Sequence, residues 1–142
     1  MEDCVFCRIA SKEEYASFVY EDKDVVAFLD SRPVSEGHTL VVPRKHYENI
    51  FEVPDEEVAN LFKVVKKLAS GILKSEKAEG ISIVQNNGEA AHQIVFHFHV
   101  HIIPRHAGQD SHRPWGAVEQ KELDMAAAKI RKFLDESKMN HC

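Results

Sequence analysis

Three histidines, His97, His99 and His101, alternate within the segment FHFHVHIIPR that spans residues 96–105. Imidazole is a side chain that binds metals, exchanges protons near neutral pH and, when neutral, attacks electrophiles. A polar loop, QNNGEAAHQ at residues 85–93, immediately precedes the segment. Because imidazole and amide groups must be hydrogen-bonded or exposed to water, packing alone does not account for such a cluster. We therefore interpret this part of the chain as a functional site.

The pattern over residues 94–103 predicts a β-strand, on which the three histidines share one face. The apolar side chains between them would then share the face that packs in the core, namely Phe96, Phe98, Val100 and Ile102. Alternate Cα atoms on a strand are about 6.6 Å apart, which puts the outer two histidines about 13 Å apart. A zinc ion needs its nitrogen ligands at about 2.0–2.1 Å. An adjacent pair could share one ion, but the whole triplet on a regular strand could not.

Length and composition limit the class of protein. The chain has 142 residues, of which 44% are hydrophobic and 29% charged, as expected for one globular domain over residues 1–142. The formal charge of −5 argues against a protein whose main partner is a nucleic acid. No apolar run approaches the ~18 residues of a membrane span, and the polar N-terminus does not resemble a signal sequence. We therefore expect no membrane partner and a cytoplasmic location.

The elements that must position the histidines follow from hydrophobic periodicity. Alternation and turn signals predict strands over 17–22, 24–30, 38–43, 81–86 and 94–103. Apolar residues three and four apart predict one long helix from Pro54 to about Lys77 and another in the C-terminal extension, residues 107–142. The expected fold class is α+β, with a mainly antiparallel five-stranded sheet, one long helix and a C-terminal helix in the same domain.

Several motifs together resemble the histidine triad family. The segment QIVFHFHVHIIPR is similar to the family signature, including a Gln four positions before the first histidine. Upstream, AFLDSRPVSEGHTLVVPRKHYENI also resembles the family, with Asp30 eight residues before His38. The similarity extends from about residue 4 to residue 106. It implies the HIT-like fold and a homodimer formed through a shared sheet.

The resemblance also implies catalytic roles. Family members attack a nucleotide α-phosphate with the middle histidine, which is His99 here. Neutral imidazole is already nucleophilic, and its pKa of about 6.5 leaves it mostly unprotonated at pH 7, so no separate base is needed. His101, Gln93 and Asn86 resemble groups that bind the phosphate oxygens and the leaving group, where fixed donors lower the barrier. His38 resembles a supporting hydrogen-bond partner.

Nucleotide binding is implied in the same way. Asp30 resembles the carboxylate that binds the ribose hydroxyls, although an Asp in this position is also a common turn former. By similarity to the family, an apolar slot for a purine base would consist of Val5, Phe6, Ile9 and Phe28. From the residues alone, each of these four is an ordinary core side chain.

A possible metal site lies outside the triplet. Cys4 and Cys7 form a C-x-x-C pair, which in a reducing compartment indicates metal ligands or a redox couple. Some family members bind zinc through such a pair, and the resemblance implies that Cys4, Cys7, His46 and His97 are the ligands. Two cysteines and two histidines complete a tetrahedral zinc, so the ion would be structural.

The functional hypothesis is a nucleotide hydrolase or nucleotidyl transferase that cleaves at the α-phosphate of a purine nucleoside phosphate derivative. The alternatives are a nucleotide-binding regulatory module with little turnover and a metalloenzyme with a catalytic zinc, against which the ligand spacing argues. The sequence leaves open whether the substrate is a phosphoramidate or a dinucleoside polyphosphate. His92 departs from the family, which often has Gly before its Gln.

Overall fold

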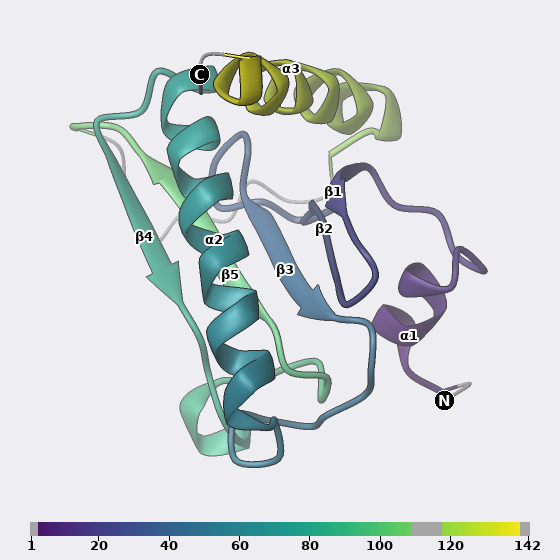
Figure 1. Ribbon diagram of the computed structural model, residues 1–142. Coiled ribbons are helices and arrows are strands. Elements are labelled where there is room, and N and C mark those ends of the chain that lie inside the picture. The colour runs from purple at the N-terminus through teal and green to yellow at the C-terminus, as the bar shows by residue number, and fades with distance from the viewer. Residues whose placement is uncertain (1–2, 109–117, 140–142) are drawn as a thin grey trace.

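The computed structural model describes residues 3–108 and 118–139, with the side chains described up to residue 135. A five-stranded, wholly antiparallel sheet has the order β1-β2-β3-β5-β4 (Figure 1). Its strands are β1 (Phe18–Glu21), β2 (Val25–Leu29), β3 (Thr39–Pro43), β4 (Gly80–Val84) and β5 (Val100–Arg105). The helices are α1 (Val5–Ala10), α2 (Asp55–Ser75), α3 (Gln120–Met139) and the short 3₁₀ helix η1 (Glu89–Ala91). This architecture confirms the predicted α+β class.

The inner strands bury side chains on both faces of the sheet. On one face, Val25, Ala27 and Leu29 of β2 join a core with α2 and α3. On the other, Val26 and Phe28 of the same strand pack in a smaller core with α1. Figure 1 shows α2 lying along the first face and α3 crossing near the C-terminal end of α2. The opposite face is therefore only partly covered, and this is where a ligand can reach the sheet.

The long helix confirms the prediction for residues 54–77 within two residues at its C-terminal end. Pro54 is the N-cap, and three acidic residues, Asp55, Glu56 and Glu57, follow in the first turn. A proline has no N–H to leave unpaired there, and carboxylates interact favourably with the positive end of the helix dipole. Within the described residues, no helix combines the length and apolar character needed to cross a membrane.

The C-terminal helix belongs to the same core as α2. Ala127, Ile130 and Leu134 are buried in the cluster that α2 forms with the sheet. A Cβ atom on Gly71 would lie 2.7 Å from Cδ2 of Leu134, so a larger residue at this position would require the Leu134 side chain to move. The extension beyond residue 107 is thus packed against the sheet domain through α3.

The strand expected over residues 94–103 is shorter and later than predicted. β5 begins at Val100, so His97 and His99 lie in irregular backbone before it and only His101 is on the strand. The reason is a competing set of hydrogen bonds: the amide of Phe98 donates to the Tyr47 carbonyl at 2.6 Å. Phe96, expected in the core, is 45% exposed. The prediction that the three histidines are evenly spaced along one strand is therefore wrong.

Two smaller differences concern the segments around the polar loop and the N-terminus. β4 ends at Val84, two residues earlier than expected, and the short helices α1 and η1 were not predicted. Both helices are too short to produce a periodic apolar pattern. α1 nevertheless matters for the site, because it covers part of the second face of the sheet.

Candidate functional site

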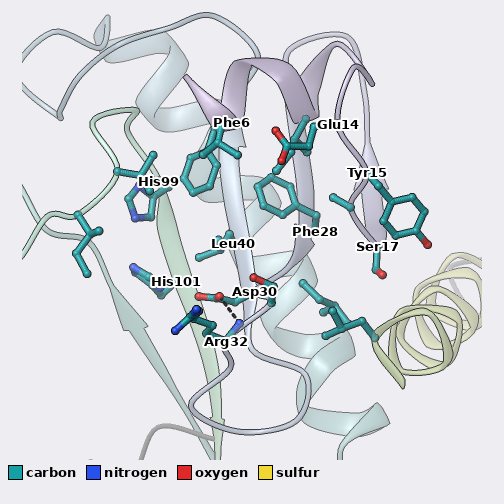
Figure 2. Close-up of a pocket in the computed structure, with 18 of the residues that line it drawn as sticks. Phe6, Glu14, Tyr15, Ser17, Phe28, Asp30, Arg32, Leu40, His99 and His101 are labelled. Carbon is teal, nitrogen blue, oxygen red and sulfur yellow. Dashed lines mark hydrogen bonds between the residues drawn. The ribbon is translucent and has the colours of Figure 1, made fainter. Parts of the chain in front are cut away.

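A pocket of 720 Å³ opens on the α1 side of the sheet, a size in the usual range for small-molecule sites. Figure 2 shows His99 and His101 at one end, Asp30 in the middle, and Phe6 and Phe28 along a wall. The pocket residues come from α1, the β2–β3 connection, the segment before β5 and the start of α3. The sequence segments singled out above therefore meet in one cavity.

Backbone carbonyls define which nitrogen of His99 carries its proton. Nδ1 of His99 lies 2.7 Å from the carbonyl oxygen of His97. Because a carbonyl only accepts, Nδ1 is the donor, and neutral His99 keeps its lone pair on Nε2. Burial also lowers the pKa of His99 below its usual range. The ring is thus held neutral, with its unprotonated nitrogen away from the backbone.

His38 and His101 form a hydrogen-bonded chain with a defined direction. The amide of Val34 donates to Nδ1 of His38 at 3.0 Å, so neutral His38 carries its proton on Nε2. This Nε2 lies 3.0 Å from Nδ1 of His101, to which it donates. His101 then carries its own proton on Nε2, as a free donor. Burial lowers the pKa of both His38 and His101 to about 4, which keeps the pair neutral.

Asp30 follows β2 directly and lines the same pocket. One carboxylate oxygen accepts from the amide of Arg32 at 2.9 Å, which is the turn-forming contact that an Asp in this position often makes. The other oxygen lies 3.7 Å from Nε2 of His38. Burial raises the pKa of Asp30. The turn role and the pocket position are thus combined in one residue.

The two amide residues of the polar loop occupy different positions. Asn86 lines the pocket. Gln93 is buried: its Oε1 accepts from the amide of Gly88 at 2.8 Å, and its Nε2 donates to the carbonyl of Val95 at 3.1 Å and to that of Glu48. The side chain of Gln93 therefore holds the loop together, and the pocket wall at this point includes His92. His92 has a φ of 70°, a conformation that glycine adopts without strain.

The apolar residues expected around a base are brought together. Val5, Phe6, Ile9 and Phe28 all line the pocket. The rings of Phe6 and Phe28 meet edge to face, with centroids 5.4 Å apart. Phe6 also contacts His99 edge to face at 5.1 Å. The apolar wall is therefore in direct contact with the ring of His99, as Figure 2 shows.

A separate cluster of Cys4, Cys7, His46 and His97 lies behind the pocket. Their ligand atoms are all within 4.8 Å of one another. Nε2 of His97 donates to the carbonyl of Pro43 at 2.8 Å, which leaves the lone pair of Nδ1 facing the two sulfurs. Burial lowers the pKa of His97 to about 4 and raises that of the Cys7 thiol. The cluster has two sulfur and two nitrogen donors.

These four residues fit a zinc ion. With Zn–S and Zn–N bonds of about 2.3 and 2.05 Å, the sulfur–nitrogen edges of a tetrahedron are about 3.6 Å long. The corresponding distances here are 3.3 Å for Cys4–His97, 3.4 Å for Cys7–His46 and 3.5 Å for Cys7–His97. Two thiolates would also balance the charge of the ion. The carbonyl of Pro43 supplies the outer hydrogen bond that orients a ligating histidine.

A second group, Asp30, His38 and His101, also brings three possible ligand atoms together. Its close contacts have another explanation, because the proton of His38 already lies between His38 and His101. Nε2 of His38 is the donor and Nδ1 of His101 is the acceptor, so neither nitrogen has a lone pair available for a metal ion. We therefore interpret this group as a hydrogen-bonded chain.

Sequence reasoning missed several pocket residues. Leu40 pairs with His101 across the sheet, and Arg32 extends beside Asp30. The far end of the pocket, with Tyr15, Ser17 and Leu123, was not anticipated either. Tyr15 and Ser17 precede β1, and Leu123 lies on α3, so only the packing of α3 reveals that they share a cavity. No local pattern in the sequence could have indicated it.

Comparison with known proteins identifies the family. The HIT domain model matches residues 11–108. An uncharacterised HIT-like protein of Methanocaldococcus jannaschii is 47% identical, over 90% of this chain and 98% of that protein. The crystal structure of a hypothetical histidine triad nucleotide-binding protein of Sulfolobus tokodaii has a TM-score of 0.89 at 41% identity, with 95% and 94% coverage. A zinc-bound histidine triad family protein of Mycobacterium smegmatis has a TM-score of 0.88 at 32% identity, with 97% coverage of each chain.

Two further relatives are named for an activity. An adenylylsulfatase of Arabidopsis thaliana is 40% identical over 72% of this chain and 52% of that protein. An adenosine 5'-monophosphoramidase of Candida albicans is 36% identical over 72% of this chain and 70% of that protein. Both names describe hydrolases of adenosine nucleotide derivatives. Together with the match over residues 11–108 and the fold described above, these similarities show that the chain belongs to the histidine triad (HIT) family.

Proposed function

We propose that this chain is a hydrolase or nucleotidyl transferase that cleaves a bond at the α-phosphate of a purine nucleoside phosphate derivative through a nucleotidyl-histidine on His99. The observation that carries the proposal is the hydrogen bond of 2.7 Å from Nδ1 of His99 to the carbonyl of His97. It leaves a nucleophilic lone pair on Nε2 of a neutral ring in the wall of the pocket. The two relatives named as hydrolases support the reaction class.

In the first step, Nε2 of His99 attacks the α-phosphorus, and a P–N bond forms as the bond to the leaving group breaks. The leaving group departs with the electron pair of that bond and takes a proton from solvent. The positive charge that develops on the His99 ring is stabilised by the His97 carbonyl, which accepts from Nδ1. In the second step, water or another acceptor attacks phosphorus and gives up its proton to solvent. The P–N bond breaks with its electron pair returning to Nε2, which regenerates neutral His99.

Two side chains would act directly on the oxygens of the phosphate, and a third would position the loop beside them. His101 would donate from Nε2, since its Nδ1 accepts from His38. Asn86 would donate from its amide, because it lines the same pocket. Gln93 would act by fixing the loop, since its amide is bonded to the backbone of Gly88, Glu48 and Val95. Donors fixed before the reaction stabilise the charge that develops in the transition state.

The remainder of the pocket would hold the nucleoside. Asp30 would accept from the ribose hydroxyls through the carboxylate oxygen that does not close the turn. Val5, Phe6, Ile9 and Phe28 would contact the faces of the purine. Phe6 and Phe28 meet edge to face, so their rings provide two apolar surfaces at an angle, against which a base would pack. The relatives named for adenosine derivatives favour adenine as the base.

Zinc is proposed as a structural cofactor held by Cys4, Cys7, His46 and His97. The supporting observations are the sulfur–nitrogen distances of 3.3–3.5 Å and the similarity to the zinc-bound protein of Mycobacterium smegmatis. The ion would cross-link the N-terminus to the segment before β5 and would supply no open coordination position. Its effect on the reaction would be to fix His97, whose carbonyl accepts from His99.

A homodimer through a shared sheet is also part of the proposal. β4 lies at one edge of the sheet, so its outer backbone groups have no neighbouring strand in the described part of the chain. Ile83 on this strand is 48% exposed. An apolar edge strand readily pairs with another strand. Sedimentation velocity at micromolar concentration would measure the expected dimer, and a monomer would contradict it.

The decisive experiment traps the covalent intermediate. The protein is incubated with an adenosine phosphoramidate or a diadenosine polyphosphate, quenched without acid, and its intact mass and tryptic peptides are measured. We expect one nucleotidyl group on His99 in the parent and none in His99→Ala. His106→Ala is the matched control, because His106 lies after β5 and does not line the pocket. This control should retain the adduct.

The outcomes separate the hypotheses. Tight nucleotide binding with no adduct and no turnover would contradict the proposal and favour a regulatory binding module. Activity that disappears on zinc removal and returns with added metal, while His99→Ala stays active, would favour a catalytic metal. Comparing kcat/KM between the two substrate types then identifies the leaving group, which neither the pocket nor the relatives define.

A further inference from the structure

The far end of the pocket is built by the C-terminal segment, outside the part of the chain that the HIT domain model covers. That model ends at residue 108, whereas Val118, Gln120 and Leu123 line the pocket. Figure 2 shows α3 at the opposite side of the view from His99 and His101, with Tyr15 and Ser17 facing it. The pocket thus ends at a wall that the shared domain does not supply.

Hydrogen bonds hold this wall in place. Ser17 donates to Oδ1 of Asp124 on α3 at 2.6 Å, and the Tyr15 hydroxyl donates to the same oxygen. The amide of Val118 donates to the carbonyl of Ser31 at 3.1 Å, directly after Asp30. Buried apolar contacts of α3 with α2 and the sheet complete the attachment. The start of α3 is therefore fixed relative to Asp30 and does not depend on a single contact.

The sheet order defines the direction in which a bound nucleotide must lie. Asp30 follows β2, His101 lies on β5 on one side, and Ser17 lies beside Leu29 on the other side, where its carbonyl accepts from that residue's amide at 3.0 Å. A nucleotide with its α-phosphate at His99 and its ribose at Asp30, as the proposed function requires, directs its base away from the histidines. The base then points along Phe28 toward the wall formed with α3.

Gln120 is a side chain at this wall whose amide is available to hydrogen-bond a base. It is exposed and lines the pocket, and among residues 3–108 and 118–135 its amide has no hydrogen-bond partner. Three neighbouring polar side chains already have partners: Tyr15 and Ser17 bond to Asp124, and Glu14 pairs with Arg8 at 3.0 Å. A carboxamide offers both a donor and an acceptor, which matches the edge of a purine.

We propose that Gln120, at the start of α3, hydrogen-bonds the edge of the base and makes the C-terminal helix an element of base specificity. The apolar slot contacts the two faces of any purine alike, so it does not distinguish one purine from another. Discrimination requires a polar group directed at the edge. A carboxamide can bond to both N1 and the C6 substituent of a purine, and it loses one of these bonds when C6 carries only hydrogen. The network of Tyr15, Ser17 and Asp124 acts as the positioning contact for this group.

The test measures binding of AMP, IMP and purine riboside 5'-monophosphate, which has hydrogen at C6, by isothermal titration calorimetry to the parent, Gln120→Ala and Lys121→Ala. Lys121 is the matched control, since it is the exposed neighbour on α3 that does not line the pocket. We expect the parent to prefer AMP over the analogue without a C6 substituent, and Gln120→Ala to reduce the ratio of these two Kd values about fivefold, the effect of one neutral hydrogen bond. Lys121→Ala should keep the parental ratio.

Every other outcome contradicts the specificity role of Gln120, the proposed reaction at His99, or both. An unchanged ratio in Gln120→Ala, or a parent without any preference, overturns the role of Gln120 while the proposed reaction stands if the His99 adduct is found. Failure of all three nucleotides to bind a folded parent overturns both. Binding with a Gln120-dependent ratio but no adduct on His99 supports the specificity role and overturns the proposed reaction. Thermal melting of each variant verifies that it is folded.

Discussion

Removal of one sulfur ligand should abolish the stabilisation of this protein by zinc. The perturbation is Cys7→Ala, because Cys7 lies 3.4 Å from His46 and 3.5 Å from His97 and so belongs to two edges of the proposed tetrahedron. Three ligands remain, but the closed site is lost. Since the site joins residues 4–7 to residues 46 and 97, the ion binds the folded chain and not the separated segments.

The magnitude follows from linkage. With free zinc buffered at 100 times its Kd, the folded state gains about 2.7 kcal/mol. For a chain of 142 residues, the entropy of unfolding is roughly 0.3 kcal/mol per degree. The Tm of the parent should therefore rise by about 9 °C when zinc is added to the metal-free protein. Cys7→Ala should show little or no rise, and its metal-free Tm should be close to that of the metal-free parent.

The assay is differential scanning calorimetry with and without buffered zinc, combined with metal analysis by mass spectrometry. Cys142→Ala is the matched control, since it removes the same side chain at the other end of the sequence. It should bind one zinc per chain and show the full rise in Tm. The reasoning is refuted if Cys7→Ala still binds one zinc and shows the full shift, or if the parent binds none.

Three further predictions concern the pocket and the turn beneath it. In His38→Ala, His101 loses the donor at 3.0 Å that defines its proton position, so kcat should fall roughly tenfold with little change in KM, as steady-state kinetics would measure. Gly37→Ala should lower the free energy of unfolding, measured in urea, by roughly 1–3 kcal/mol. The φ of Gly37 is 91°, and a new Cβ would lie 2.7 Å from Cγ of Glu76. Gly80→Ala is the control, because a Cβ at that position meets no atom within 4 Å. Burial raises the pKa of Glu76 to about 7, so the folded state binds its proton more tightly than the unfolded state does. The unfolding free energy of the parent relative to that of Glu76→Gln should therefore fall as pH rises from 5 to 7, because the buried histidines contribute equally to both proteins.

Each of the three has a result that would contradict it. Equal kcat values for the parent and His38→Ala would show that His101 does not need its partner. Equal losses of unfolding free energy in Gly37→Ala and Gly80→Ala would contradict the role given to the backbone conformation of Gly37. An unfolding free energy of the parent that rises relative to that of Glu76→Gln between pH 5 and 7 would contradict the raised pKa of Glu76, since the sign for a raised carboxyl pKa is fixed.

Much of the fold was accessible from periodicity. The long helix was predicted because its apolar residues repeat over 21 residues, enough for the period to be unambiguous. Strands β2 and β3 were predicted because each is a short, largely apolar run bounded by turn signals. α1, with six residues, was missed because one and a half turns leave no period to detect. The start of β5 was missed because the amide of Phe98 bonds to Tyr47, a contact distant in the sequence.

The sequence by itself determined which residue types were available and which of them resemble a known site: the alternating histidines, the C-x-x-C pair and the Asp before His38. Only the tertiary structure decided their individual chemistry. The proton positions of His97 and His99 depend on carbonyl oxygens at 2.8 and 2.7 Å, and that of His101 depends on the ring of His38, directly before β3. An imidazole has two equivalent candidates for its proton until a neighbour selects one, and such neighbours are set by folding rather than by sequence order. For the same reason, only the packing of α3 brought Gln120 to the pocket.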